Sequence, residues 1–121
     1  KRRETIVELY DKANELAKAI QNCKEYVELV EAGKVLAEDE KTAHLVQDFL
    51  IMQAQLAYAE SMGNKPIRKK IEQLNRMAEQ LKKNETAMAY LQKYNRWQAM
   101  AGEVYQVIQN AMAEGMSILD K

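Results

Sequence analysis

Helix-breaking residues are scarce in this chain, with one proline and four glycines spread over 121 residues. The rest is rich in Ala, Leu, Glu, Lys, Gln and Met, which are the residues that favour helices most. A balance of 47% hydrophobic and 30% charged residues indicates a folded chain rather than a disordered one. We therefore predict an all-α protein, an antiparallel helical hairpin or bundle of about five helices that forms a single domain over residues 1–121.

Apolar residues recur at spacings of three and four along the chain, which is the period of an amphipathic helix. Ile6, Leu9 and Leu16 follow this spacing in the first segment, and Ile67 and Ile71 begin a similar repeat in the fourth. The pattern predicts helices over residues 4–21, from 22–24 to about 37, 41–62, 66–83 and 86–118.

The residues between these segments are typical of helix ends. Asn22, with a glutamate three residues later, resembles a capping box that would start the second helix. Asp39 and Asn84 are expected to cap the third and fifth helices. Gly63 suits a left-handed C-cap of the third helix, and Pro66 suits the first turn of the fourth.

The third and fifth segments are long and apolar over much of their circumference, so each must be covered from more than one side. Gly102 and Gly115 lie inside the fifth, where glycine costs about 1 kcal/mol relative to alanine, and a closely approaching helix would compensate. We expect a second chain to share the burial, giving a homodimer or a tetramer. The predicted oligomer interface consists of Phe49, Met52, Leu56, Trp97, Ala101, Gly102, Tyr105 and Ile108.

The single cysteine, Cys23, cannot form an internal disulfide, which suits a reducing, cytoplasmic location. It continues the apolar repeat of the first helix, so packing is favoured over a role as nucleophile, metal ligand or redox switch. The chemical alternative rests on a nearby helix N-terminus and on Lys24, which would lower the pKa of the thiol. No apolar run reaches the roughly 18 residues of a membrane span, so none is expected.

The patterns of common enzymes are missing from this sequence. His44 is the only histidine, and although Glu40 precedes it by one turn, the Glu-x-x-His motif of di-iron bundles does not occur. No glycine-rich phosphate loop and no Gly-x-Ser-x-Gly elbow occurs either. We therefore expect a protein that is not an enzyme and that has no catalytic or metal-binding residues.

The formal net charge is zero, but its distribution is uneven. Residues 25–40 contain six acids and one base, whereas residues 65–83 contain seven bases and two acids. Arg68, Lys69, Arg76 and Lys83 could meet RNA phosphates or an acidic partner. A solvated face, or pairing with the acidic segment, is favoured because aromatic residues that would stack on bases are missing from residues 65–83.

The stretch ANELAKAIQNCKEYVELVEAGKVLAEDEKTAHLVQDFLIMQAQL resembles the small bacterial helical regulators of the YlbF, YmcA and YheA family. The matching residues are a Leu-Ala-x-x-Ile seam, a Glu-Tyr turn, an alanine-rich acidic helix, an acidic cap and a central Phe-x-x-x-Gln. In this chain they are Leu16, Ala17, Ile20, Glu25, Tyr26, Ala32, Ala37, Asp39, Phe49 and Gln53. The closing stretch ETAMAYLQKYNRWQAMAGEVYQVIQNAM is also similar, so the resemblance spans roughly residues 8–112.

The resemblance implies an all-helical protein that forms homo- or hetero-oligomers, with a second copy or a paralogous helical protein as partner. It also implies an accessory role in RNA processing by the endoribonuclease RNase Y, which influences competence, biofilm formation and sporulation. A place in the less defined YheA-like branch is the alternative. Some relatives carry C-terminal cysteines linked to iron–sulfur binding, but no cysteine follows Cys23 here, so no cofactor is expected.

Overall fold

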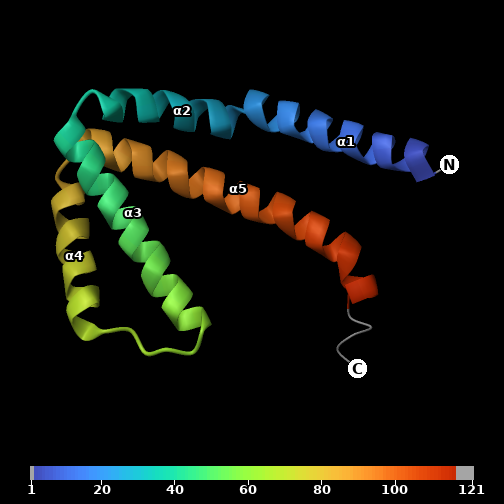
Figure 1. The fold of residues 1–121 in the computed structure, drawn as a ribbon. Helices are drawn as coiled ribbons and strands as arrows, with labels where there is room; N and C mark the ends of the chain where they lie inside the picture. Colours follow the sequence, from blue (N-terminus) through green and yellow to red (C-terminus); the bar gives the residue numbers. More distant parts are fainter. Residues whose placement is uncertain (1, 117–121) are drawn as a thin grey trace. The chain divides into compact units, whose positions relative to one another are not determined.

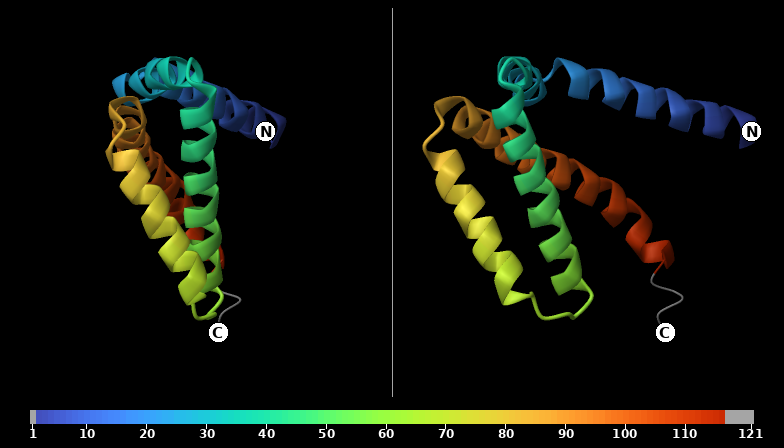
Figure 2. Two further views of the ribbon diagram at one scale, coloured as in Figure 1. Left: turned by 90° about the vertical axis from the view of Figure 1, so that its left-hand side faces the viewer. Right: turned by 60° about the vertical axis from the view of Figure 1, so that its left-hand side comes forward.

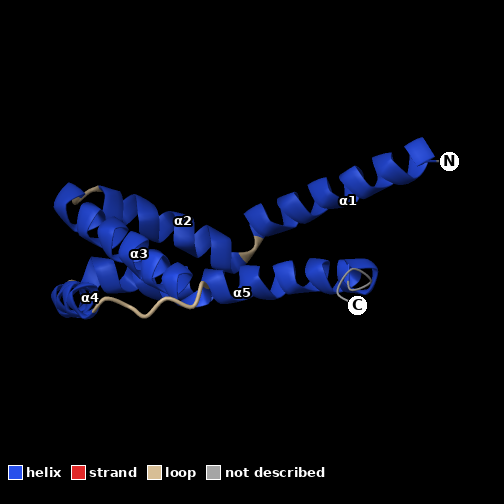
Figure 3. Cartoon of the chain, turned by 60° about the horizontal axis from the view of Figure 1, so that its bottom comes forward, coloured by secondary structure: helices blue, strands red, loops and turns tan. Residues whose placement is uncertain are grey.

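The computed structural model describes residues 2–116 and shows only helices joined by short connections within that range (Figures 1 and 3). The all-α prediction is therefore confirmed for the described chain. The end predicted for the fifth helix, residue 118, lies outside the described residues. The helices are α1 (Arg2–Asn22), α2 (Lys24–Ala37), α3 (Glu40–Ser61), α4 (Arg68–Lys82) and α5 (Glu85–Met116).

The roles predicted for two residues at helix ends are wrong, although α2 begins at Lys24, within the predicted range of 22–24. Asn22 is the last residue of α1, and its side-chain amide donates a hydrogen bond to the carbonyl of Lys18 at 2.8 Å. It therefore closes α1 instead of starting α2. Pro66 precedes α4 rather than opening it, because Ile67 takes the extended conformation of an N-cap residue and α4 begins at Arg68.

The described chain forms two compact units. One unit contains α1, the start of α2 through Leu29, and α5 from Lys93 onward. The other runs from Val30 to Gln92 and contains the rest of α2, all of α3 and α4, and the first part of α5. The prediction of a single domain stays a prediction.

The unit from Val30 to Gln92 has its own apolar core. In it α3 and α4 lie side by side as an antiparallel hairpin (Figure 2). The core side chains come from α2, α3, α4 and α5, and Phe49, Leu50 and Tyr90 pack against them while remaining partly exposed. The buried core residues are Leu36, Val46, Leu81, Ala87 and Leu91.

A network of side-chain hydrogen bonds joins the starts of α3 and α5. The backbone N–H and the hydroxyl of Thr42 both donate to the carboxylate of Asp39, which holds the pKa of Asp39 below its ordinary value. Asn84 donates from its amide nitrogen to the Thr42 hydroxyl at 3.3 Å and accepts from the Ala87 N–H at 2.9 Å. Both predicted caps are thus confirmed, and they are linked to each other.

Replacing Asn84 by alanine is expected to lower the free energy of unfolding by about 1–2 kcal/mol, because α5 loses its N-cap and Thr42 loses a donor. Urea unfolding followed by circular dichroism measures the loss. Asn95→Ala, an exposed change inside α5, is the matched control and should leave stability unchanged or slightly higher. Equal effects of the two changes would contradict the linked-cap interpretation.

Gly63 ends α3 as predicted. Its φ of +82° lies in the left-handed region, where a side chain is strained. The N–H groups of Gly63 and Asn64 donate to the carbonyls of Glu60 and Ala59, both at 3.0 Å, which is the bonding pattern of a Schellman motif. This turn begins the connection that forms the tip of the α3–α4 hairpin.

Candidate interaction surface

The first helix buries none of its side chains, although it is 21 residues long. Leu9 is 66% exposed, and the residues that the periodicity predicts to pack with it are exposed as well. Most of the stability of a protein helix comes from packing of its apolar face rather than from helix propensity, so the described chain by itself gives α1 little of this stabilisation. The apolar residues of α1 that remain exposed are Ile6, Val7, Leu9, Tyr10 and Leu16.

The second half of α5 is equally open, with Tyr105 62% exposed and Val107 exposed to a similar degree. A side chain added at Gly102 would meet no atom within 4 Å, so the predicted close approach to Gly102 is not made within the described chain. We define the open surface as the seam of α1 together with that of distal α5. It consists of Ile6, Leu9, Leu16, Tyr105, Ile108 and Met112.

The start of α2 is anchored on the middle of α5. The Lys93 ammonium donates to the Glu28 carboxylate at 3.0 Å, and the Arg96 guanidinium lies 3.9 Å from the same oxygen. The hydrogen bond from Lys93 is the main reason why the pKa of Glu28 lies below its ordinary value. The rings of Tyr26 and Trp97 meet edge to face, with their centroids 5.2 Å apart. These contacts hold the first turns of α2, which directly follow α1, against α5.

The predicted interface residues of α3 are partly covered by this chain itself. Phe49 packs against the core, and Met52 and Leu56 turn toward the connection to α4. All three are half-buried. The outward face of α3 instead presents Ile51 and Tyr58, which periodicity alone does not separate from the covered face.

The predicted interface residues of α5 divide into two groups. Trp97 and Ala101 are half-buried, whereas Gly102, Tyr105 and Ile108 are exposed. The distal three therefore lie in the part of α5 that carries the open surface.

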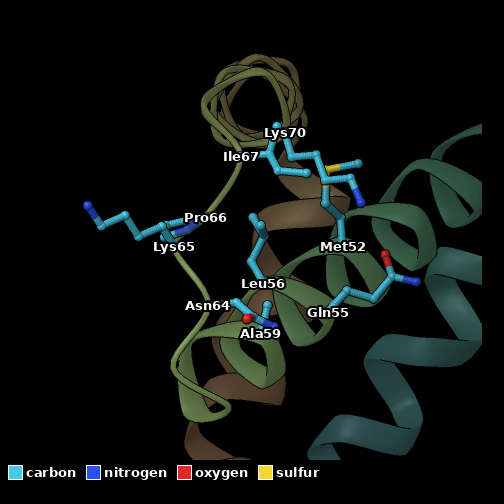
Figure 4. Close-up of a pocket in the computed structure, with 9 residues that line it drawn as sticks. All are labelled: Met52, Gln55, Leu56, Ala59, Asn64, Lys65, Pro66, Ile67 and Lys70. Atoms are coloured by element: carbon cyan, nitrogen blue, oxygen red, sulfur yellow. The ribbon is translucent and has the colours of Figure 1, made fainter.

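A pocket of about 270 Å³ lies between the second half of α3 and the connection to α4 (Figure 4). Its aliphatic side chains come from both sides, and Lys65 and Lys70 belong to its lining. Sequence reasoning did not predict this pocket, although the Gly63–Pro66 connection marks where the two helices separate. The lining residues are Met52, Gln55, Leu56, Ala59, Asn64, Lys65, Pro66, Ile67 and Lys70.

The basic residues predicted as a binding face on α4 lie in solvent. Arg68, Lys69, Arg76 and Lys83 are all exposed. Arg68 pairs with Glu72 at 3.4 Å, one turn further along the same helix. In the acidic segment of residues 25–40, Glu28 bonds Lys93 of α5 and not a residue of α4.

The remaining polar candidates do not form a chemical site in the described chain. Cys23 is half-buried at the bend between α1 and α2, and His44 is exposed on α3. Among residues 2–116, no group of three or more His, Cys, Asp or Glu side chains could hold a metal ion. Within that same range, no helix combines the length and the apolar character needed to cross a bilayer.

Comparison with known families places most of the sequence within one family model. A family described as control of the competence regulator ComK, YlbF/YmcA, matches residues 9–113. A UPF0342 protein of Clostridium tetani is 30% identical over 114 residues, which are 93% of this chain and 97% of the relative. A UPF0342 protein of Streptococcus uberis is 22% identical over 107 residues, covering 88% of this chain and 96% of the relative.

Two solved structures are similar in fold. The first is a protein of unknown function (DUF964) from Bacillus stearothermophilus, with a TM-score of 0.68 and 20% identity, covering 88% of this chain and 94% of the other. The second is Bacillus subtilis RicA, solved in complex with RicF, with a TM-score of 0.56 and 22% identity. The match covers 91% of this chain and 97% of the other. Both likenesses show that the arrangement of helices is shared.

Proposed function

This chain belongs to the YlbF/YmcA family, and from that membership we propose that it is a non-enzymatic helical adaptor that acts by assembling with other helical chains. The family is of a regulatory type, which is consistent with the expectation that the chain is not an enzyme. The proposal assigns no cofactor and no catalytic residue to the chain.

The observation that carries the proposal is the open surface. A helix that buries none of its side chains gains almost no stability from tertiary packing, yet α1 has a regular apolar seam. Contiguous exposed apolar seams of this kind are typical of protein–protein interfaces. A second copy of the chain, presenting its own α1 and distal α5, offers matching seams and is the partner that we propose for the purified protein.

A related chain is the second partner that we propose for the same surface. The similar protein RicA was crystallised in complex with RicF, which supports pairing between related family members. We also propose that the assembled adaptor is an accessory factor in RNA processing by RNase Y, and that it influences competence, biofilm formation and sporulation in this way. The YheA-like branch, without that role, is the alternative within the family.

Direct RNA binding by residues 65–83 is the second candidate function. The exposure of Arg68, Lys69, Arg76 and Lys83 favours it, because phosphate contacts need accessible cations. The missing aromatics in that segment and the zero net charge make protein assembly the better-supported candidate.

Sedimentation equilibrium over a range of protein concentrations tests the proposed function. We expect the wild-type chain to have a mass that is a multiple of 14.0 kDa, and an open-surface variant, Leu9→Asp with Tyr105→Asp, to assemble less. A wild-type protein that stays a single chain at micromolar concentration would contradict the proposal.

A further inference from the structure

The pocket at the tip of the α3–α4 hairpin has aliphatic walls that come from a single compact unit, Val30–Gln92. On α3 it is lined by Met52, Leu56 and Ala59, whose spacings of four and three place them on one face of the helix. Pro66 and Ile67, in the connection before α4 begins, line it from the other side (Figure 4). The interior of the pocket is therefore suited to a saturated hydrocarbon group.

The polar side chains that line the pocket include no acid. They are two lysines and the neutral amides of Gln55 and Asn64. Figure 4 shows the Lys70 side chain running from α4 toward α3 and ending beside Met52, whereas the Lys65 side chain extends away from the pocket. Within residues 2–116, neither lysine forms an ion pair. Lys70 is thus an unpaired cation at the rim of an aliphatic pocket.

The size of the pocket limits the ligand to a small molecule. Its volume of about 270 Å³ lies just below the range of roughly 300–1,000 Å³ that is usual for pockets that hold drug-sized ligands. The single ammonium group at the rim matches one negative charge. We propose that this pocket binds a medium-chain aliphatic carboxylate, with octanoate as the test compound, whose chain lies between α3 and the connection and whose carboxylate meets Lys70.

Nucleotides and other aromatic ligands fit this pocket less well. Its lining contains no aromatic side chain on which a base could stack. The carboxyl end of a protein also joins an aliphatic group to a carboxylate, but its peptide N–H groups need acceptors. Lysine provides none, which leaves only the two side-chain amides among the polar lining side chains. A free aliphatic acid has no such requirement and is the better match.

This inference goes beyond the proposed function, because the pocket is separate from the open surface and needs no second chain. It assigns a small-molecule site to a protein for which we propose only assembly with other chains. The two are therefore tested independently.

Methyl-group NMR of the full chain during titration with sodium octanoate locates the site. We expect saturable shifts of the Met52, Leu56 and Ile67 methyl signals. The methyl signals of Ile51, on the outward face of α3, and of Leu9, on the open surface, should not move. From butanoate to octanoate each added methylene should tighten binding by up to about fourfold, and the gain should level off once the chain fills the pocket.

A pair of leucine substitutions tests whether the chain enters the pocket. Ala59→Leu places extra side-chain atoms in the cavity and should weaken octanoate binding at least about tenfold, because several methylenes lose their burial. Ala57→Leu adds the same atoms at an exposed position of α3 outside the lining and should leave binding unchanged. Circular dichroism of both variants checks that they remain folded.

A pair of lysine substitutions tests the place of the carboxylate. Lys70→Gln should weaken octanoate binding by up to about fivefold, as expected for an exposed ion pair. It should also remove the preference of the protein for octanoate over octylammonium. Lys65→Gln removes the same charge from a side chain that extends away from the pocket, so it should retain that preference.

Five results would overturn the inference. They are no methyl shift at millimolar octanoate, shifts of Leu9 and Ile51 as large as those of the pocket methyls, affinity that keeps rising with chain length through dodecanoate, equal effects within either pair of variants, and tighter binding of acetyl-leucyl-leucine than of octanoate. The last would assign the pocket to the carboxyl end of a protein. Each of them leaves assembly through α1 and α5, which sedimentation measures, unaffected.

Discussion

The open-surface variant, Leu9→Asp with Tyr105→Asp, is expected to have half the mass of the wild-type assembly or less. Each substitution replaces an exposed apolar side chain by a carboxylate. Assembly would bury this carboxylate without a hydrogen bond or an opposite charge to compensate for it. Losing the burial of one such side chain costs about 1.5–3 kcal/mol.

In a two-fold assembly each substitution is present twice, so the effect on binding is large. The four lost side chains together weaken association by roughly 6 kcal/mol or more, or more than about ten-thousand-fold in Kd. Lys18→Asp with Asn110→Asp is the control, because both residues are exposed and lie away from the apolar seams. Two results would contradict the proposed function: a control whose assembly loses as much mass as that of the open-surface variant, or an open-surface variant whose assembly has the wild-type mass.

Leu81→Ala is expected to be the most destabilising single change in the unit from Val30 to Gln92. Leu81 is 1% exposed and is one of the two largest fully buried side chains, in contact with the cluster of Leu36, Val46, Ala87 and Leu91. Truncating a buried leucine to alanine costs about 2–5 kcal/mol, from lost burial and from the cavity that remains. A small unit with five buried apolar residues has little else to compensate.

Urea unfolding of Leu81→Ala beside Met88→Ala measures this difference. Met88 is exposed on α5, so its truncation should cost less than about 1 kcal/mol. If the two variants unfold at the same urea concentration, Leu81 is not at the centre of the core.

Helix positions and helix ends were predictable where a local interaction decides them. Asp39 and Asn84 each cap a helix by a bond to a backbone N–H three residues later, and Gly63 adopts the left-handed conformation that glycine favours. The roles predicted for Asn22 and Pro66 were wrong because a different local interaction is made at each of these helix ends. The Asn22 amide bonds back to Lys18, and Ile67 rather than Pro66 adopts the N-cap conformation.

The side of each helix that stays open could not be predicted, because periodicity identifies apolar seams but not what covers them. The seam of α1 is regular, yet none of its side chains is buried. On α3 the prediction chose Phe49 and its neighbours, which this chain partly covers, and passed over Ile51 and Tyr58. The charge segments show the same limit, since Glu28 bonds Lys93 on α5 rather than the basic α4.

Amide hydrogen exchange of α1 in the intact protein tests the central claim most directly. A helix without buried side chains lacks the tertiary packing that supplies most helical stability, so α1 should exchange rapidly unless another chain covers it. We predict slow exchange across Arg2–Asn22 in the wild-type protein at concentrations where it assembles, and fast exchange there in the open-surface variant. Equally fast exchange of α1 in both proteins would show that no chain covers this helix, and would contradict the account.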